Sequence, residues 1–333
     1  MAEWNENKLE QELETLAEEM PEQADLEQKI QQSITRRIKR IAGVTALAVL
    51  LAVATLFLCI SPLMNLMFWD PTEPGEGEQL LAFSVLRDYW ETTTPYVDLI
   101  RMQVEKKGFG CYRLAIEATN HREALRVGTT NLWIDVNRGK YENRQDAKGY
   151  FVHHIGRFED FIIDAERKEK LLQELQALPQ SAYVYLSVAG AQPRGIEELR
   201  NETVDLLWVQ VYQPNVEWQG GLSMCMTAAY EKEDVREKLN EQELLEVYRS
   251  NLKNMLEHPE VWEEFNLSDG SSFIYTPASG VLEKTYEDAQ NLETLMVKNY
   301  CVSGTRDEII EYLQRTDVTS VKVDEVILSK WSY

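Results

Sequence analysis

The sequence lacks the short motifs by which hydrolases and nucleotide enzymes are usually recognised. It contains no HExxH, no GxSxG, no P-loop and no GxGxxG segment. It has only four histidines and four cysteines, and Cys59, Cys111, Cys225 and Cys301 lie far apart. This spacing fits neither a CxxC metal site nor a disulfide scaffold. The pairing of the last three cysteines stays open.

The remaining candidates for chemistry are isolated residues. Ser250 and Lys253 have the SxxK spacing of serine acyl-enzymes, but no SDN or KTG element accompanies them. His153 and His154 are adjacent, and on a strand they would point to opposite faces instead of binding one metal ion. The turn that begins at Asp269 has a single Asp, which is no calcium site. We therefore expect no enzyme activity, no cofactor and no metal.

Positive charge is also scarce. The chain has 34 Lys and Arg against 56 Asp and Glu, a net charge of −22. An acidic surface repels the phosphate backbone of nucleic acids. We expect no direct nucleic-acid partner, so any role in transcription would act through another protein.

One long run of the chain has no charge at all. From Ile41 to Trp69 there is no Asp, Glu, Lys or Arg, whereas about 20 apolar residues suffice to cross a bilayer. Residues 41–60 are apolar on every helical face, unlike a soluble amphipathic helix. A buried core helix and a cleaved signal peptide are the alternatives. Because a long segment precedes the run, we expect an uncleaved transmembrane helix with a basic flank, residues 36–69.

The flanking charges predict the direction of this helix. Four basic residues lie between Arg36 and Arg40, and acidic residues follow from Asp70. Lys and Arg next to a span stay in the cytoplasm. We therefore expect a single-pass protein of the cell membrane, with a cytoplasmic N-terminus and an extracytoplasmic C-terminus. Phe68 and Trp69 would be aromatic anchors at the outer interface, before a polar linker.

The cytoplasmic segment, residues 1–35, carries apolar residues at helical spacing. Pro21 is expected to separate two amphipathic helices. The segment is too short and polar to bury its own core, which favours a partner that supplies a groove. A solvated arm that merely extends the span is the alternative. The candidate partner-binding residues are Leu9, Leu13, Leu16, Met20, Leu26, Ile30 and Ile34, and Ile38 continues the stripe.

The first outer part, residues 70–160, has the pattern of a β-rich region. We predict strands over 97–104, 111–118 and 132–136, because apolar and polar residues alternate there. Gly108 and Gly139 mark the turns.

The second outer part, residues 161–333, repeats the order strand, helix, strand. We predict one unit over 182–212 and another over 296–328, with a capping box at Thr305 that begins the second helix. Between them lies a helical insertion, residues 231–265. The fold class is therefore α+β: a single transmembrane helix, a β-rich part, and a ferredoxin-like (split βαβ) part with a helical insertion.

Several short segments occur in a characteristic order and spacing: Arg36–Arg40, Thr94–Tyr96, Gly108–Tyr112, Val184–Val188, Gly195–Leu199, the strand around Trp208, Val302–Thr305 and Val323–Val326. Together they resemble the membrane-anchored sigma factor regulator family of Gram-positive bacteria. The resemblance implies an N-terminal and a C-terminal regulator domain outside the membrane, and no catalytic residues. Zinc-type anti-sigma factors carry HxxxCxxC, but the inner segment here has neither His nor Cys, so it would hold its partner without metal.

These observations give a first hypothesis and a second one. In the first, the inner helices restrain an extracytoplasmic-function sigma factor while the outer part senses an envelope condition. In the second, the chain is an anchored extracytoplasmic binding or sensor module without a sigma-factor partner. In either case the lipid bilayer is a partner, and the sequence does not identify the outer ligand.

Overall fold

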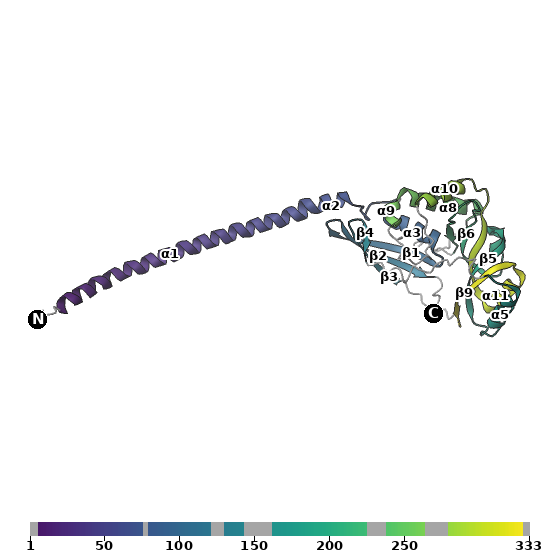
Figure 1. The fold of residues 1–333 in the computed structure, drawn as a ribbon, viewed down its shortest axis with the longest axis horizontal. Coiled ribbons are helices and arrows are strands. Elements are labelled where there is room, and N and C mark those ends of the chain that lie inside the picture. The colour runs from purple at the N-terminus through teal and green to yellow at the C-terminus, as the bar shows by residue number, and fades with distance from the viewer. Residues whose placement is uncertain are drawn as a thin grey trace. The chain divides into compact units, whose positions relative to one another are not determined.

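A computed structural model describes residues 6–75, 79–120, 130–142, 162–224, 238–263 and 279–328, with side chains from Gln28 onward (Figure 1). The predictions for His153, His154, Cys225 and Asp269 lie outside these residues. The chain divides into two units, residues 1–63 and 64–333. The α+β class is confirmed: one long apolar N-terminal helix is followed by two antiparallel sheets with interspersed helices.

The N-terminal region is helical almost from its start. Helix α1 covers Glu6–Thr55, a π-helical turn covers Leu56–Ile60, and α2 covers Ser61–Met67. The predicted break at Pro21 is wrong, because α1 runs through it. A proline inside a helix removes one backbone donor and strains one turn, but the flanking turns keep their own hydrogen bonds. Residues Gln28–Met67 form a helix long and apolar enough for one membrane span or a signal sequence.

The first sheet is a meander of β1 Val97–Gly108, β2 Cys111–Asn120, β3 Thr130–Asn137 and β4 Lys140–Glu142, in the order β1-β2-β3-β4. The predicted strands and both turns are confirmed. Leu114 pairs with Ile134, and both are fully buried. Their neighbours on the opposite face are polar or exposed, which is the period-2 pattern of a sheet with one buried face.

The chain between α2 and the first sheet packs against the outer unit. The Trp69 ring meets the Tyr141 ring edge to face, with centroids 5.8 Å apart, and is half-buried against the core. The Asp70 carboxylate pairs with Lys106 at 3.4 Å. The interfacial role predicted for Phe68 and Trp69 stays a prediction.

The second sheet has the order β7-β6-β8-β5-β9, and every neighbouring pair is antiparallel. The predicted units are both present: the first is β5, α6 and β6, and the second is β8, α11 and β9. Within each unit the two strands are separated by one strand of the other unit. The capping box at Thr305 is also confirmed, with Glu308 as its second member. The bounds are β5 Tyr183–Gly195, α6 Ile196–Arg200, β6 Asp205–Val211, β7 Gly221–Ser223, β8 Met296–Thr305, α11 Arg306–Arg315 and β9 Val318–Ile327.

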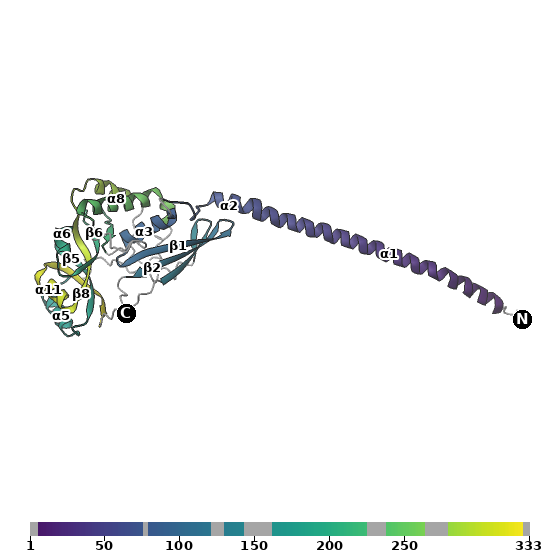
Figure 2. The ribbon, with the colours of Figure 1, turned by 180° about the vertical axis from the view of Figure 1, so that it is seen from behind.

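The remaining helices surround these sheets. The helical insertion predicted over 231–265 is confirmed for α8, where Leu244, Tyr248, Leu252 and Met255 are fully buried. In both views α3 lies between α8 and the strands, and α5 lies beside α11 (Figures 1 and 2). The sequence patterns predicted neither α3, α5 nor α10. The bounds are α3 Leu81–Thr93, α5 Ala165–Gln176, α8 Glu241–Glu257, α9 Pro259–Trp262 and α10 Ser279–Gln290.

Candidate functional site

The part of the predicted partner-binding stripe with described side chains is exposed. Ile30 and Ile34 are 49% and 50% exposed, and Ile38 is 60% exposed. A spacing of four residues places all three near one face of α1. The other five candidates from Leu9 to Leu26 lie in the same helix, outside the part with described side chains. The structure thus places the candidates on one helix in place of the predicted two.

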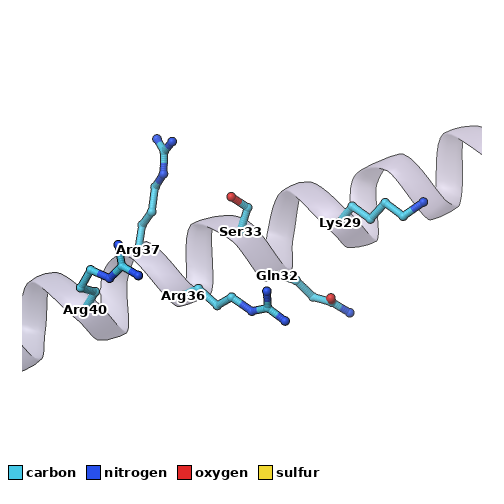
Figure 3. Close-up of a pocket in the computed structure, with 6 residues that line it drawn as sticks. All are labelled: Lys29, Gln32, Ser33, Arg36, Arg37 and Arg40. Carbon is cyan, nitrogen blue, oxygen red and sulfur yellow. The ribbon is translucent and has the colours of Figure 1, made fainter.

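A basic band lies on a neighbouring side of the same helix. Figure 3 shows Lys29, Gln32, Ser33, Arg36, Arg37 and Arg40 projecting from α1, with Arg37 and Ser33 toward one edge of the band and Gln32 and Arg36 toward the other. The helical repeat of about 100° per residue separates this band from Ile34 and Ile38. The segment before the apolar run therefore has a cationic side and an apolar side.

Charge along α1 changes sign along the sequence. The stretch from Glu6 to Glu27 is rich in Glu, whereas the stretch from Lys29 to Arg40 carries only basic charges. Two copies of the acidic stretch side by side would repel each other. An apolar groove with a basic rim is the complementary surface for this stretch.

In the outer unit, a buried polar cluster joins the segment before β1 to the second sheet. Tyr96 Oη donates to Asp324 Oδ2 at 2.8 Å, and Ser187 Oγ donates to the same oxygen at 2.5 Å. Lys322 Nζ lies 3.3 Å from Asp324 Oδ1, and the Asp324 side chain is only 4% exposed. Burial raises the pKa of Tyr96 well above its usual value, and the neighbouring Cys301 thiol and Asp324 carboxylate act in the same direction. The tyrosine therefore stays a protonated donor.

A second buried carboxylate ties α3 to the insertion. Glu91 accepts from Asn251 Nδ2 at 3.0 Å and from the Ser223 backbone N–H at 3.3 Å. The Glu91 carbonyl accepts from Trp208 Nε1 at 2.8 Å. These groups satisfy one another, as buried polar groups require, and they indicate a structural joint.

Sequence reasoning had missed both joints. Tyr96 and Asp324 stand out in the sequence only as parts of the matching segments Thr94–Tyr96 and Val323–Val326, and nothing marks Glu91. A signal did exist for Asp324, since a charged residue lies within a strand whose other residues include Val321, Val323 and Val326. Such a residue on a covered sheet face needs a partner.

The open face of the first sheet carries an exposed aromatic ring. Trp133 is 57% exposed and pairs in register with Ala115 on β2. Beside it, the Arg113 guanidinium donates two hydrogen bonds to the Asp135 carboxylate, 2.7 and 3.0 Å long. Lys107 Nζ lies 3.0 Å from the same carboxylate. These contacts lower the pKa of Asp135 strongly, with the Arg113 hydrogen bond as the largest cause. Trp133 alternates with the buried Leu132 and Ile134, which accounts for its outward position.

The isolated candidates for chemistry do not assemble into a site. Ser250 and Lys253 are exposed on α8 and form no hydrogen bond with each other. Among the residues that the structure describes, no group of three or more His, Cys, Asp or Glu has the arrangement of a metal site. Cys59 and Cys111 are free thiols, and Cys301 is fully buried.

Comparisons with protein-family models, with curated proteins and with solved structures find no match to this chain.

Proposed function

We propose that this chain is a single-pass membrane signalling protein that restrains an extracytoplasmic-function sigma factor through α1 and senses an envelope condition through its outer unit. The observation that carries the proposal is the exposed stripe of Ile30, Ile34 and Ile38 directly before the apolar run. Three exposed isoleucines on one face are costly in water and are typical of a helix that lies in a partner's groove.

The proposal includes an orientation and a detailed fold. The basic residues from Arg36 to Arg40 favour a cytoplasmic N-terminus and an uncleaved anchor. The order of strands in the second sheet supports a ferredoxin-like arrangement with β7 as an added edge strand. The resemblance to sigma factor regulators adds the identity of the partner, and the acidic stretch before Glu27 supports a partner with a basic rim.

The orientation is tested by cysteine labelling in intact cells. In a background without native cysteines, Glu6→Cys and Lys170→Cys would be treated with a membrane-impermeant thiol reagent. Lys170 is exposed on α5, so its replacement should react, whereas the one at Glu6 should react only after lysis. Labelling at Glu6 in intact cells would overturn the proposed orientation.

The partner is tested by purifying the tagged full chain from solubilised membranes of its own cells. A sigma factor recovered in stoichiometric amount supports the proposal. Recovery of outer ligands alone would favour the second function.

That second function is an anchored binding module, and the observation in its favour is Trp133. A ring 57% exposed between charged pairs is a platform on which a flat ligand can stack. Trp133→Ala should weaken the binding of such a ligand and leave the recovery of the sigma factor unchanged. Loss of sigma-factor recovery in this variant would instead connect the sheet face with signalling.

A further inference from the structure

The last turn of α2 is bound to the turn between β1 and β2. The Gly110 backbone N–H donates to Asn65 Oδ1 at 2.7 Å. A side chain at Gly110 would place its Cβ 2.9 Å from Phe68 Cδ2, and the residue has φ = +73°, so the position favours glycine on both counts. The turn is thereby held against the residues at which the apolar helix ends.

The same end of the sheet carries the turn between β3 and β4. Arg138 N–H donates to the Gly110 carbonyl at 2.8 Å, and Cys111 pairs in register with Asn137. Arg138 and Gly139 have φ = +52° and +77°, the values of a tight type I′ hairpin turn. Both turns therefore lie beside the end of α2.

Basic side chains gather at these two turns although the chain as a whole has a net charge of −22. Lys106 and Lys107 lie at the first turn, and each pairs with an aspartate. Arg138 and Lys140 lie at the second turn, are exposed, and form no ion pair with another described residue. Arg138 and Lys140 therefore add positive charge that no described ion pair neutralises.

Two exposed apolar side chains follow Asn65, the residue that binds the first of these turns. Leu66 and Met67, in the last turn of α2, are 85% and 77% exposed. Exposed apolar residues bordered by Lys and Arg are typical of a surface that contacts lipid at the level of the headgroups.

We propose that this end of the first sheet, comprising Lys106, Lys107, Arg138 and Lys140, is a second membrane contact, at which the four cations bind the phosphate groups of anionic lipids. The proposal rests on the proposed function only in taking the apolar helix as a membrane span. Each Lys or Arg near an anionic bilayer surface contributes about 1 kcal/mol. Arg138 and Lys140, which form no ion pair with a described residue, should contribute most, because Lys106 and Lys107 also pair with aspartates.

The test is lysine footprinting of the full chain in nanodiscs, with a soluble acylating reagent and mass spectrometry. Nanodiscs of phosphatidylcholine alone are compared with nanodiscs that also contain phosphatidylglycerol. Acylation of Lys106, Lys107 and Lys140 should slow about fivefold with the anionic lipid. Lys170 and Lys253, exposed on α5 and α8, are internal controls and should not change.

The acylation rate of Lys39, which lies just before the apolar run, distinguishes failure of the second membrane contact from failure of the membrane span. If Lys39 slows but the three sheet lysines do not, the second contact is wrong and the span stands. If neither Lys39 nor the sheet lysines slow, the membrane span is wrong and the proposal falls with it.

A charge-reversed variant tests whether the cluster itself binds. Arg138→Glu with Lys140→Glu should return the rates of Lys106 and Lys107 to those in phosphatidylcholine, and unchanged rates at Lys170 and Lys253 show that the variant is folded. The matched control is Arg167→Glu with Lys170→Glu on α5, which should leave Lys106 and Lys107 slowed. Continued slowing of Lys106 and Lys107 in the first variant would overturn the proposal.

Discussion

Tyr96 Oη and Asp324 Oδ2 are 2.8 Å apart although 228 positions separate the two residues in the chain. The hydrogen bond joins the segment that enters the first sheet to the edge strand of the second. Tyr96 has φ = +71°, which is uncommon for a residue with a side chain. A backbone in this region costs roughly 1 to 3 kcal/mol and persists only where contacts hold it.

We therefore predict that Tyr96→Phe destabilises the outer unit. The variant keeps the ring but removes a hydrogen bond to a charged group, which should lower the free energy of unfolding by about 1.5 to 3 kcal/mol. Urea unfolding of the full chain in detergent micelles measures this. Tyr212→Phe is the control, since that hydroxyl bonds no other described residue and its loss should cost little. Equal stability of the two variants would refute the role of this hydrogen bond.

A glycine pair provides a packing test. At Gly221 an added Cβ would lie 1.8 Å from Trp208 Cζ2, whereas at Gly195 it would meet nothing within 4 Å. Gly221→Ala should cost about 3 kcal/mol or more, because the indole has no room to move. Gly195→Ala should change the free energy of unfolding by less than about 0.5 kcal/mol. Thermal unfolding of both variants measures these changes. A small loss of stability in Gly221→Ala would mean that Trp208 packs differently.

The ion pairs of Asp135 predict an acid dependence. Arg113 and Lys107 lower the pKa of this carboxyl below the value of about 3.9 expected in the unfolded chain. Its contribution to stability is therefore full above pH 4 and is lost as the pH falls through the folded-state pKa. Because the pair lies at the surface, Asp135→Asn should cost about 1 kcal/mol or less at pH 7.

The measurement is urea unfolding at pH 7 and at successively lower pH. The difference between Asp135→Asn and the unaltered chain should shrink as the pH falls below 4. Glu169→Gln, at an exposed position on α5 without an ion pair to a described residue, should show no such trend. A difference that is constant with pH would mean that the charge of Asp135 contributes nothing.

Local patterns in the sequence predicted much of this fold. Alternation around Leu114 and Ile134 and the capping box at Thr305 each depend on neighbours along the chain, and the structure confirms them. The predicted order of strand, helix and strand also fits one shared sheet, since Leu186 on β5 pairs with Val302 on β8.

The features that the sequence did not reveal depend on distant residues. Helix α3 is buried on nearly every side, including Asp88 and Glu91, so its polar residues hid its role in the core. The contact between Trp69 and Tyr141 also joins residues far apart in the chain, and the uncharged run that ends at Trp69 gave no sign of it. The helix break predicted at Pro21 is wrong for the opposite reason. The prediction used only the local effect of proline, whereas the helical turns on both sides keep α1 continuous.

The most direct test of the central claim uses two pairs of charge-matched variants on α1. Ile30→Asp with Ile34→Asp places two acids on the exposed apolar stripe, and Gln32→Asp with Ser33→Asp places the same charge on the basic side (Figure 3). The quantity measured is the amount of sigma factor that co-purifies with each full chain, at equal abundance in the membrane. Two buried isoleucines contribute about 3 kcal/mol or more, so the first pair should reduce binding by a hundredfold or more. The second pair should change binding by a few fold at most. Charges at the rim of an interface affect the association rate more than the dissociation rate. Equal recovery from both pairs, or no sigma factor with the unaltered chain, would contradict the account.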